Sequence, residues 1–491
     1  MTLSAEPASA KSLVPGPAAE PLLRALPLAY ARRHGVLPLE RRAGEVVVAV
    51  GTALDPVVLD DLRFLYRVPI RPTLVPDALL AEAIPRAYDR TAGTAADAVE
   101  AIESAGLDEI RDEMRRELYE PPELLEGGDE APVIRLVNAL LHEAVSAGAS
   151  DIHVEPGERD LVVRFRVDGL LRSVLRTPRR LCPALASRVK IMAGLDIGER
   201  RLPQDGRFAV RVAGRPVDVR VSLVPTAFGE RTVLRLLDRT AVTTDFASLG
   251  IDGACERGLR RLLALSHGLV LVTGPTGSGK TTTLYAALRH FGDGERNVMT
   301  IEDPVEFHLE GIAQTQVAPR IGLDFAAGLR SILRQDPDVV LVGEIRDRET
   351  AEIALQAALT GHLVFATLHT NDAATAATRL LDMGAEPFLI TSALVAVIAQ
   401  RLVRCTCTAC GGTGCATCDE TGFRGRTAIH EFMPVDDAIR ALVMQRAEAA
   451  AIHRAAAERG MESLLVTGTR KAQAGITTMT EVLRATRTGA E

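Results

Sequence analysis

The sequence predicts an α/β protein whose core is a sheet of parallel strands buried on both faces. Near-continuous apolar runs at residues 269–273, 297–303, 338–344 and 363–370 each end in polar residues, which is typical of such strands. The first run leads into a glycine-rich loop and then a helical pattern. With 491 residues, the chain is long enough for about three domains. We place the core domain at residues 243–404.

The loop after the first run carries the spacing G-x-x-x-x-G-K-[ST] of the phosphate-binding loop (P-loop) of P-loop NTPases. Its residues are Gly274, Pro275, Thr276, Gly277, Ser278, Gly279, Lys280, Thr281 and Thr282. Backbone N–H groups and the dipole of the following helix converge there on an anion, which predicts ATP binding. We expect Lys280 to reach the β- and γ-phosphates and Thr281 to ligate Mg²⁺. The alternative is a glycine-rich turn that binds nothing.

The chain before residue 130 reads as a tail, a small domain and a linker. Residues 1–20 are rich in alanine and proline and lack the apolar segment of a signal peptide, so we expect a flexible N-terminus. Residues 21–90 alternate helical and strand patterns, which predicts a small α/β domain without a catalytic motif. Residues 91–129 are alanine-rich and then strongly charged, which favours a solvated linker over an acidic docking site.

A second N-terminal domain is predicted over residues 130–242. A helical pattern is followed by strands in which arginines alternate with apolar residues, so one sheet face is buried and the other carries arginines. Arginines on an open sheet face are usually only solvated. Arg207, Arg220 and Arg235 are of greater interest, because an NTPase needs cations near the γ-phosphate besides its P-loop lysine.

Acidic residues end two further strands of the predicted core, at the edge where parallel sheets bind ligands. We assign Glu344 as the Walker B acid, which holds Mg²⁺ through water or orients and deprotonates the attacking water. Glu302, Asp303 and Glu306 form an acidic cluster that would serve the outer shell of the metal. The alternative for this cluster is a solvated turn.

Histidines lie toward both ends of the stretch GHLVFATLH, which is predicted to be a strand. A single histidine is more often structural, whereas His362 and His369 at the two ends of one strand favour γ-phosphate sensing or water positioning. Arg330, Arg334 and Arg346 lie around the strand of Glu344, and some of them are expected to pair only with nearby acids.

Five of the seven cysteines lie between residues 405 and 418. Two C-x-x-C pairs in a near tandem repeat are formed by Cys407, Cys410, Cys415 and Cys418. This is the spacing of a structural zinc site with four thiolate ligands, with free thiols as the alternative. We predict a zinc lobe at residues 405–432, and Cys405 leaves open which four sulfurs bind. Residues 433–491 read as C-terminal helices.

The overall composition excludes some classes of function. Hydrophobic residues make up 47% and charged residues 25% of the chain, as in soluble globular proteins. A formal charge of −7, no tryptophan and 3% aromatic residues argue against a general nucleic-acid-binding protein. The most apolar later stretch, residues 388–399, is too short to span a bilayer, so we expect a cytoplasmic protein.

Four motifs resemble, in order and spacing, the nucleotide-site boxes of the secretion ATPases that drive type II secretion and type IV pili. They are GPTGSGKTT, MTIEDPVEF, LRQDPDVVLVGEIRD and TGHLVFATLHTNDA. The resemblance spans residues 130–435, because ASDIHVEP, RLPQDGR and DVRVS are similar to the second N-terminal domain of that family. The segments LPLAYARRHGVLPL and LLEGGDEAPVIRLVNALL are most similar to the type II secretion branch.

This resemblance implies a RecA-like P-loop core, a preceding PAS-like α+β domain and a homohexamer with ATP held between the two. It implies that Arg207, Arg220 and Arg235 sense the γ-phosphate. Supporting positions fall on Arg330, Arg334 and Arg346. The resemblance also supports a zinc lobe, although the spacer between the cysteine pairs is usually longer in relatives.

The implied function is a Mg-dependent ATPase that drives pseudopilus assembly in type II secretion while peripherally associated with the inner membrane. The implied partners are the cytoplasmic domain of a bitopic docking protein and a polytopic platform protein, with no nucleic acid. One alternative is a type IV pilus extension ATPase. A zinc-containing nucleic-acid translocase is another, and a scaffold that binds ATP without turnover is a third, which Lys280 and Glu344 argue against.

Overall fold

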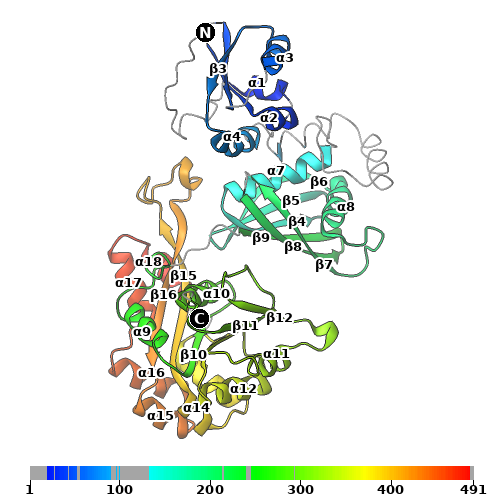
Figure 1. Cartoon of the computed structure of the whole chain (residues 1–491). Helices are drawn as coiled ribbons and strands as arrows, with labels where there is room; N and C mark the ends of the chain where they lie inside the picture. The colour runs from blue at the N-terminus through cyan, green and yellow to red at the C-terminus, as the bar shows by residue number, and fades with distance from the viewer. Residues whose placement is uncertain are drawn as a thin grey trace. The chain divides into compact units, whose positions relative to one another are not determined.

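The computed structural model divides into two compact units, Met1–Thr240 and Ala241–Glu491 (Figure 1). The structure describes residues 19–26, 28–42, 44–51, 56–89, 95–96, 99, 132–212, 215–238, 245–291 and 294–486. Residues 1–18 of the predicted tail (residues 1–20) and most of the predicted linker lie outside the described residues.

The first unit opens with a three-stranded sheet and four helices. The strands are β1 (Val36–Arg42), β2 (Glu45–Val50) and β3 (Ile70–Leu74), in the order β1-β2-β3, with β1 antiparallel and β3 parallel to β2. The helices are α1 (Glu20–Ala25), α2 (Leu28–His34), α3 (Pro56–Tyr66) and α4 (Asp77–Asp89). Apolar side chains of β2 pack against Leu62 of α3 and Leu80 of α4, which gives this part a core of its own.

A six-stranded antiparallel sheet follows, in the order β6-β5-β4-β9-β8-β7. Its strands are β4 (Ala149–Pro156), β5 (Asp160–Val167), β6 (Leu170–Pro178), β7 (Gln204–Val212), β8 (Arg215–Thr226) and β9 (Gly229–Asp238). Helices α7 (Pro132–Ser146) and α8 (Cys182–Ala193), the latter preceded by η3 (Arg179–Leu181), pack on one face (Figure 1). Because strand side chains alternate between faces, Val163 and Phe165 are buried beneath the helices while Arg164 and Arg166 lie on the other face.

The second unit is built on a seven-stranded sheet in the order β12-β11-β13-β14-β10-β15-β16. Its strands are β10 (Gly268–Thr273), β11 (Val298–Glu302), β12 (Ala313–Gln316), β13 (Val339–Val342), β14 (Leu363–Leu368), β15 (Leu394–Thr406) and β16 (Phe423–Pro434). Every neighbouring pair is parallel except β15 and β16, which form an antiparallel hairpin. The predicted α/β fold is therefore confirmed.

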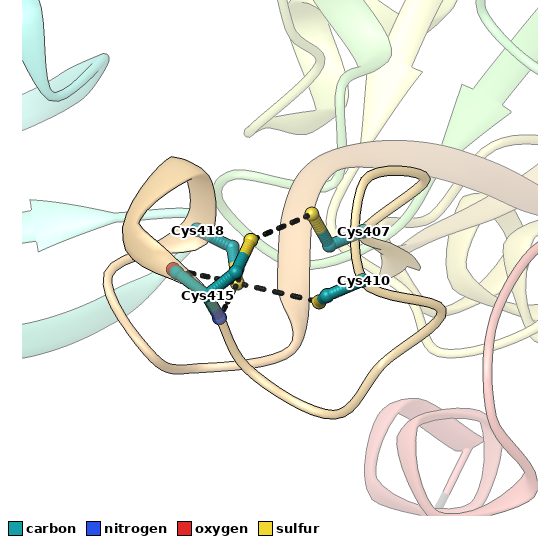
Figure 2. A group of neighbouring side chains, drawn as sticks. All are labelled: Cys407, Cys410, Cys415 and Cys418. Carbon is teal, nitrogen blue, oxygen red and sulfur yellow. Dashed lines mark hydrogen bonds between the residues drawn. The ribbon is translucent and has the colours of Figure 1, made fainter.

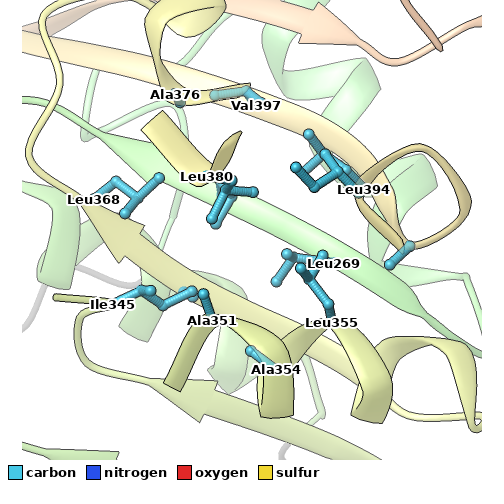
Figure 3. Packing of buried hydrophobic residues seen from close by; sticks show 14 of the residues in the cluster. Leu269, Ile345, Ala351, Ala354, Leu355, Leu368, Ala376, Leu380, Leu394 and Val397 are labelled. Carbon is cyan, nitrogen blue, oxygen red and sulfur yellow. The ribbon is translucent and has the colours of Figure 1, made fainter. Parts of the chain in front are cut away.

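Two apolar clusters bury the faces of this sheet. Leu269 and Leu271 of β10 belong to one cluster, shown in Figure 3, while Val270 and Val272 belong to the other. The helices of this unit are α9 (Gly253–Leu263), α10 (Lys280–Leu288), α11 (Phe325–Ile332), α12 (Arg348–Leu359), α13 (Ala373–Asp382), α14 (Pro387–Ala393), α15 (Asp437–Met444), α16 (Ala449–Glu458), α17 (Leu464–Gln473) and α18 (Met479–Thr486). Burial on both faces explains why β10 is apolar at consecutive positions.

Aspartates cap the first turns of several helices of this unit, among them α11, α12 and α13. Asp324, Asp347 and Asp372 each accept a hydrogen bond from a backbone N–H of the first turn of α11, α12 and α13, at 2.8, 2.8 and 2.7 Å. Such caps satisfy N–H groups that have no partner within the helix. The loops after β13 and β14 are thereby held in defined paths. Among the described residues, none of the helices has the length and apolar character needed to cross a bilayer.

The buried imidazole of His430 predicts that acid destabilises the second unit. His430 lies in β16 and is 3% exposed, and burial lowers its pKa to about 4, with Lys471 acting in the same direction. As the pH falls, the imidazole is protonated near pH 6.5 in the unfolded chain but only at a lower pH in the folded chain. Stability present above about pH 6.5 is therefore lost as the pH falls toward 4, by up to about 3 kcal/mol.

Urea unfolding at about pH 7 and about pH 5 measures this loss in the wild type and in His430→Gln. We expect a clearly smaller loss in the variant, because it has no imidazole to protonate. The matched control is His267→Gln, since His267 is exposed in the same unit. An equal loss in the wild type and in His430→Gln would contradict the prediction.

Candidate active site

The P-loop joins a fully buried strand, β10, to helix α10, which begins at Lys280. A Cβ atom at Gly274 would lie 2.5 Å from the carbonyl oxygen of Gln400 and 2.6 Å from Oγ of Ser278, so no larger residue fits there. Gly279, just before α10, has a φ of 86°, in the left-handed region that favours glycine. The close backbone path leaves the N-terminus of α10 open to an anion.

The Lys280 side chain folds back over this loop. Its Nζ donates hydrogen bonds to the carbonyl oxygens of Gly274 and Pro275, at 2.8 and 3.0 Å. Burial lowers its pKa to about 8, an effect that Glu344 opposes and Arg401 reinforces. A desolvated ammonium group of this kind interacts more strongly with a phosphate than a solvated one would.

Gln400 of β15 supports the loop, and its role is not predicted from the sequence motifs. Its Nε2 donates to the carbonyl oxygen of Ser278 at 2.8 Å, and its Oε1 accepts from the hydroxyl of Thr283 in α10, also at 2.8 Å. The Gln400 side chain is buried, and a Cβ at Gly279 would lie 2.8 Å from its Nε2. The available sequence signal was a glutamine interrupting the apolar pattern LVAVIAQRL.

Glu344 follows β13 and lies beside two other predicted site residues, Arg346 and His369. Its carboxylate pairs with Arg346, and Nε2 of His369 lies 3.3 Å from its Oε2. The guanidinium of Arg346 also lies 3.9 Å from the carboxylate of Asp303. Only 13% of the Glu344 side chain is exposed. The structure therefore gathers a carboxylate, an imidazole and a guanidinium at the carboxyl edge of the sheet.

The two predicted histidines lie at opposite ends of β14. The hydroxyl of Thr273, the last residue of β10, accepts from the backbone N–H of Thr370 at 2.9 Å, which holds His369 near the P-loop. His362 precedes β14, and its Nδ1 lies 2.9 Å from the carbonyl oxygen of Ala357. Because β14 spans about 20 Å, only His369 is brought to the loop within this unit.

The acidic cluster divides in a similar way. Asp303 is exposed and reaches toward Arg346, whereas Glu302 is 4% exposed and accepts hydrogen bonds from three side chains. The backbone N–H of Glu306 lies 3.4 Å from the hydroxyl of Tyr285. The predicted metal-shell role of this cluster stays a prediction, and its members are not equally placed for it.

Three arginines around β13 are placed in different ways. Arg330 pairs with Glu349 on the surface. Arg334 donates to the carbonyl oxygen of Arg330 at 2.9 Å, so it contacts its own helix turn. Arg346 alone among these three contacts Glu344.

The three arginines of the first unit form a row across neighbouring strands. Arg207 of β7 lies opposite Arg220 of β8, which lies opposite Arg235 of β9. Nε of Arg235 donates to Oδ1 of Asp151 at 3.0 Å. They share the sheet face that α7 and α8 leave uncovered. Their role toward a nucleotide stays a prediction.

The tetracysteine lobe connects β15 to β16 (Figure 1), and Figure 2 shows its four cysteine side chains. The sulfur atoms lie within 4.8 Å of one another and belong to Cys407, Cys410, Cys415 and Cys418. Three sulfur pairs are separated by 3.9, 3.8 and 3.7 Å. A tetrahedral zinc site with Zn–S bonds of about 2.3 Å has S···S edges of about 3.8 Å, so the donor set fits zinc. Cys405 is not part of this group.

A strand of a parallel sheet leads through a glycine-rich loop into a helix that begins with lysine, and a carboxylate follows β13. These features define the class of RecA-like P-loop NTPases. The chain belongs to the secretion ATPase family: the family described as "Type II/IV secretion system protein" matches residues 126–484. A second match, to the "MshEN domain", covers residues 12–94. The resemblance drawn from the four motifs is therefore confirmed, and the family is one of ATPases.

Curated relatives agree along most of the chain. "Type II secretion system protein E" of Klebsiella pneumoniae is 49% identical over 504 residues, covering 96% of this chain and 98% of the relative. "Type IV pilus assembly ATPase PilB" of Myxococcus xanthus is 44% identical over 491 residues, covering 94% of this chain and 86% of the relative.

Solved structures share the fold. The pilus retraction motor PilT with bound ADP is 28% identical with a TM-score of 0.52, covering 72% of this chain and 97% of that chain. The ATPase DotB of Legionella pneumophila has a TM-score of 0.58 at 24% identity, covering 73% of this chain and 96% of that chain. The DotB likeness concerns the fold alone.

Replacing Gln400 tests its role as a brace. Gln400→Leu leaves the Ser278 carbonyl and the Thr283 hydroxyl without their partner, so we expect a loss of about 1–3 kcal/mol in the free energy of unfolding. Hydrogen exchange at the amides of the P-loop should rise at the same time. Gln356→Leu, on the exposed face of α12, is the matched control. Unchanged exchange at the P-loop in Gln400→Leu would show that the brace is dispensable.

Proposed function

We propose that the chain is a Mg-dependent ATPase motor that powers type II secretion by driving pseudopilus assembly at the inner membrane. The observation that carries the hydrolytic part is the placement of Glu344 between Arg346 and His369 at the P-loop edge of the sheet. The relatives named for type II secretion, which match most of the chain, support the secretion part.

The site residues divide the chemistry between them. The P-loop backbone and Lys280 would bind the phosphates of ATP, Thr281 and Glu344 would hold Mg²⁺, and Asp303 would be a further acid available to the metal. Bound Mg²⁺ neutralises phosphate charge during phosphoryl transfer. Glu344 orients the attacking water and accepts its proton, and its contacts with Arg346 and His369 hold the carboxylate in one orientation.

We further propose that the chain works as a homohexamer in which Arg207, Arg220 and Arg235 sense the γ-phosphate. Three guanidiniums in cross-strand register can offer a concentrated positive charge to a triphosphate. The small N-terminal domain would dock to the cytoplasmic domain of a bitopic membrane protein, and a polytopic platform protein would receive the work. The motor would be cytoplasmic and peripherally associated with the inner membrane, and nucleic acid is not an expected partner.

A second candidate function is extension of a type IV pilus. The observation that favours it is the pilus assembly ATPase of Myxococcus xanthus, which matches this chain over nearly the same length as the type II secretion relatives do. Complementation separates the two candidates. Restoration of secretion in a strain lacking its secretion ATPase supports the first, and restoration of pili alone supports the second.

Glu344→Gln tests the hydrolytic assignment. The amide cannot accept the proton of the attacking water, so we expect ATP turnover to fall by about 100-fold or more while binding of a fluorescent ATP analogue persists. Phosphate release and fluorescence titration measure the two quantities. Glu349→Gln, which loses only a surface ion pair, is the matched control. Unchanged turnover in Glu344→Gln would contradict the assignment.

We propose that the tetracysteine lobe holds one structural zinc ion per chain. Elemental analysis of the purified protein should find zinc, and Cys410→Ser should lose it together with thermal stability of the lobe. Cys405→Ser should retain it, because Cys405 lies outside the sulfur cluster. Equal zinc content in the two variants would overturn the assignment of the four ligands.

A further inference from the structure

A buried polar network ties the P-loop helix to the acidic turn after β11. Tyr285 of α10 is 1% exposed, and its hydroxyl donates to Oε2 of Glu302, the last residue of β11. Oε1 of Glu302 accepts from the hydroxyl of Thr300 at 2.6 Å and from Nε2 of Gln314, in β12, at 3.1 Å. Both carboxylate oxygens are therefore engaged by side chains of three different elements.

The same network reaches the loop between β11 and β12. Nε2 of Gln314 donates to the carbonyl oxygen of Phe307 at 3.2 Å, and its Oε1 accepts from the backbone N–H of Leu309 at 2.7 Å. The rings of Tyr285 and Phe307 pack edge to face with centroids 4.5 Å apart. One end of the network therefore lies in the P-loop helix and the other holds the turn that carries Asp303.

The backbone of Glu302 also lies against the segment that carries Glu344. The N–H of Gly343 donates to the carbonyl oxygen of Ile301 at 2.7 Å, and a Cβ at Gly343 would lie 3.2 Å from Cα of Glu302. Because Gly343 packs closely on the backbone at residues 301 and 302, we expect a displacement of the Glu302 backbone to disturb the residue that precedes Glu344. A buried carboxylate needs its donors to remain in place, since losing one leaves an ionised oxygen unpaired.

We infer that Glu302 is a positioning residue for ATP hydrolysis and that Tyr285 is the group that holds it. This inference rests on the proposed ATPase function. Glu302 couples the P-loop helix to the acidic turn and to the Glu344 segment, whereas the exposed Asp303 is the acid available to the metal. Glu302 and Asp303 are adjacent in one sequence motif, but they would have different roles.

Tyr285→Phe and Glu302→Gln test the inference, singly and together. Tyr285→Phe keeps the ring packed on Phe307 and removes only the hydroxyl, so the variant retains its apolar contacts. We expect each single change to lower kcat by about tenfold or more while the Mg²⁺ concentration for half-maximal rate changes by less than about twofold. Asp303→Asn should instead raise that Mg²⁺ concentration.

The double variant gives the decisive comparison. Without the tyrosine hydroxyl, a neutral amide at residue 302 is less costly than an unpaired carboxylate, so the double variant should be no slower than Tyr285→Phe alone. The inference would be overturned if the two single changes lowered kcat independently, so that their effects multiplied in the double variant. A raised Mg²⁺ requirement in Glu302→Gln would also overturn it and would support a role for Glu302 in the outer shell of the metal.

Hydrogen exchange tests the network without relying on turnover. Amides of residues 303–312 should exchange faster in Tyr285→Phe than in the wild type, because the turn loses its link to α10. Unchanged exchange there would also overturn the inference. A wild-type protein that hydrolyses no ATP contradicts the proposed function, whereas the exchange comparison still decides whether the network holds the turn.

Discussion

The second unit depends on one constraint: its sheet, parallel except for β16, is covered on both faces, so a ligand can reach polar groups only where the strands end. Leu269 and Val270 are adjacent in β10 yet enter different apolar clusters, so the strand itself can carry no chemistry. The P-loop, Glu344 and His369 all follow the carboxyl ends of strands. The burial of the sheet therefore determines where the candidate active site lies.

This constraint explains why much of the site could be predicted from the sequence. Local signals are strong where an apolar run stops at a glycine, an acid or a histidine, and the P-loop, Glu344 and His369 share that pattern. His362 belongs to the same motif, but it precedes β14 whereas His369 follows it. The length of the strand therefore separates His362 from the P-loop, and the residue type alone does not predict that separation.

The remaining groups could not be predicted because their partners are remote in the chain. Gln400 contacts Ser278 across 122 positions, and Gln314 contacts Glu302 only because β12 returns beside β11. Glu302 and Asp303 look equivalent in a motif, yet one is enclosed by donors and the other is exposed. Such contacts depend on the order of the strands in the sheet, and a sequence motif does not specify that order.

The arginine row of the first unit follows a different logic. Like charges directly opposite one another on neighbouring strands destabilise a sheet, so placing Arg207, Arg220 and Arg235 in one row raises the free energy of the folded domain. Asp151 lies beside the last of them and offsets part of that repulsion. Under the proposed function, a bound triphosphate would offset more of this repulsion.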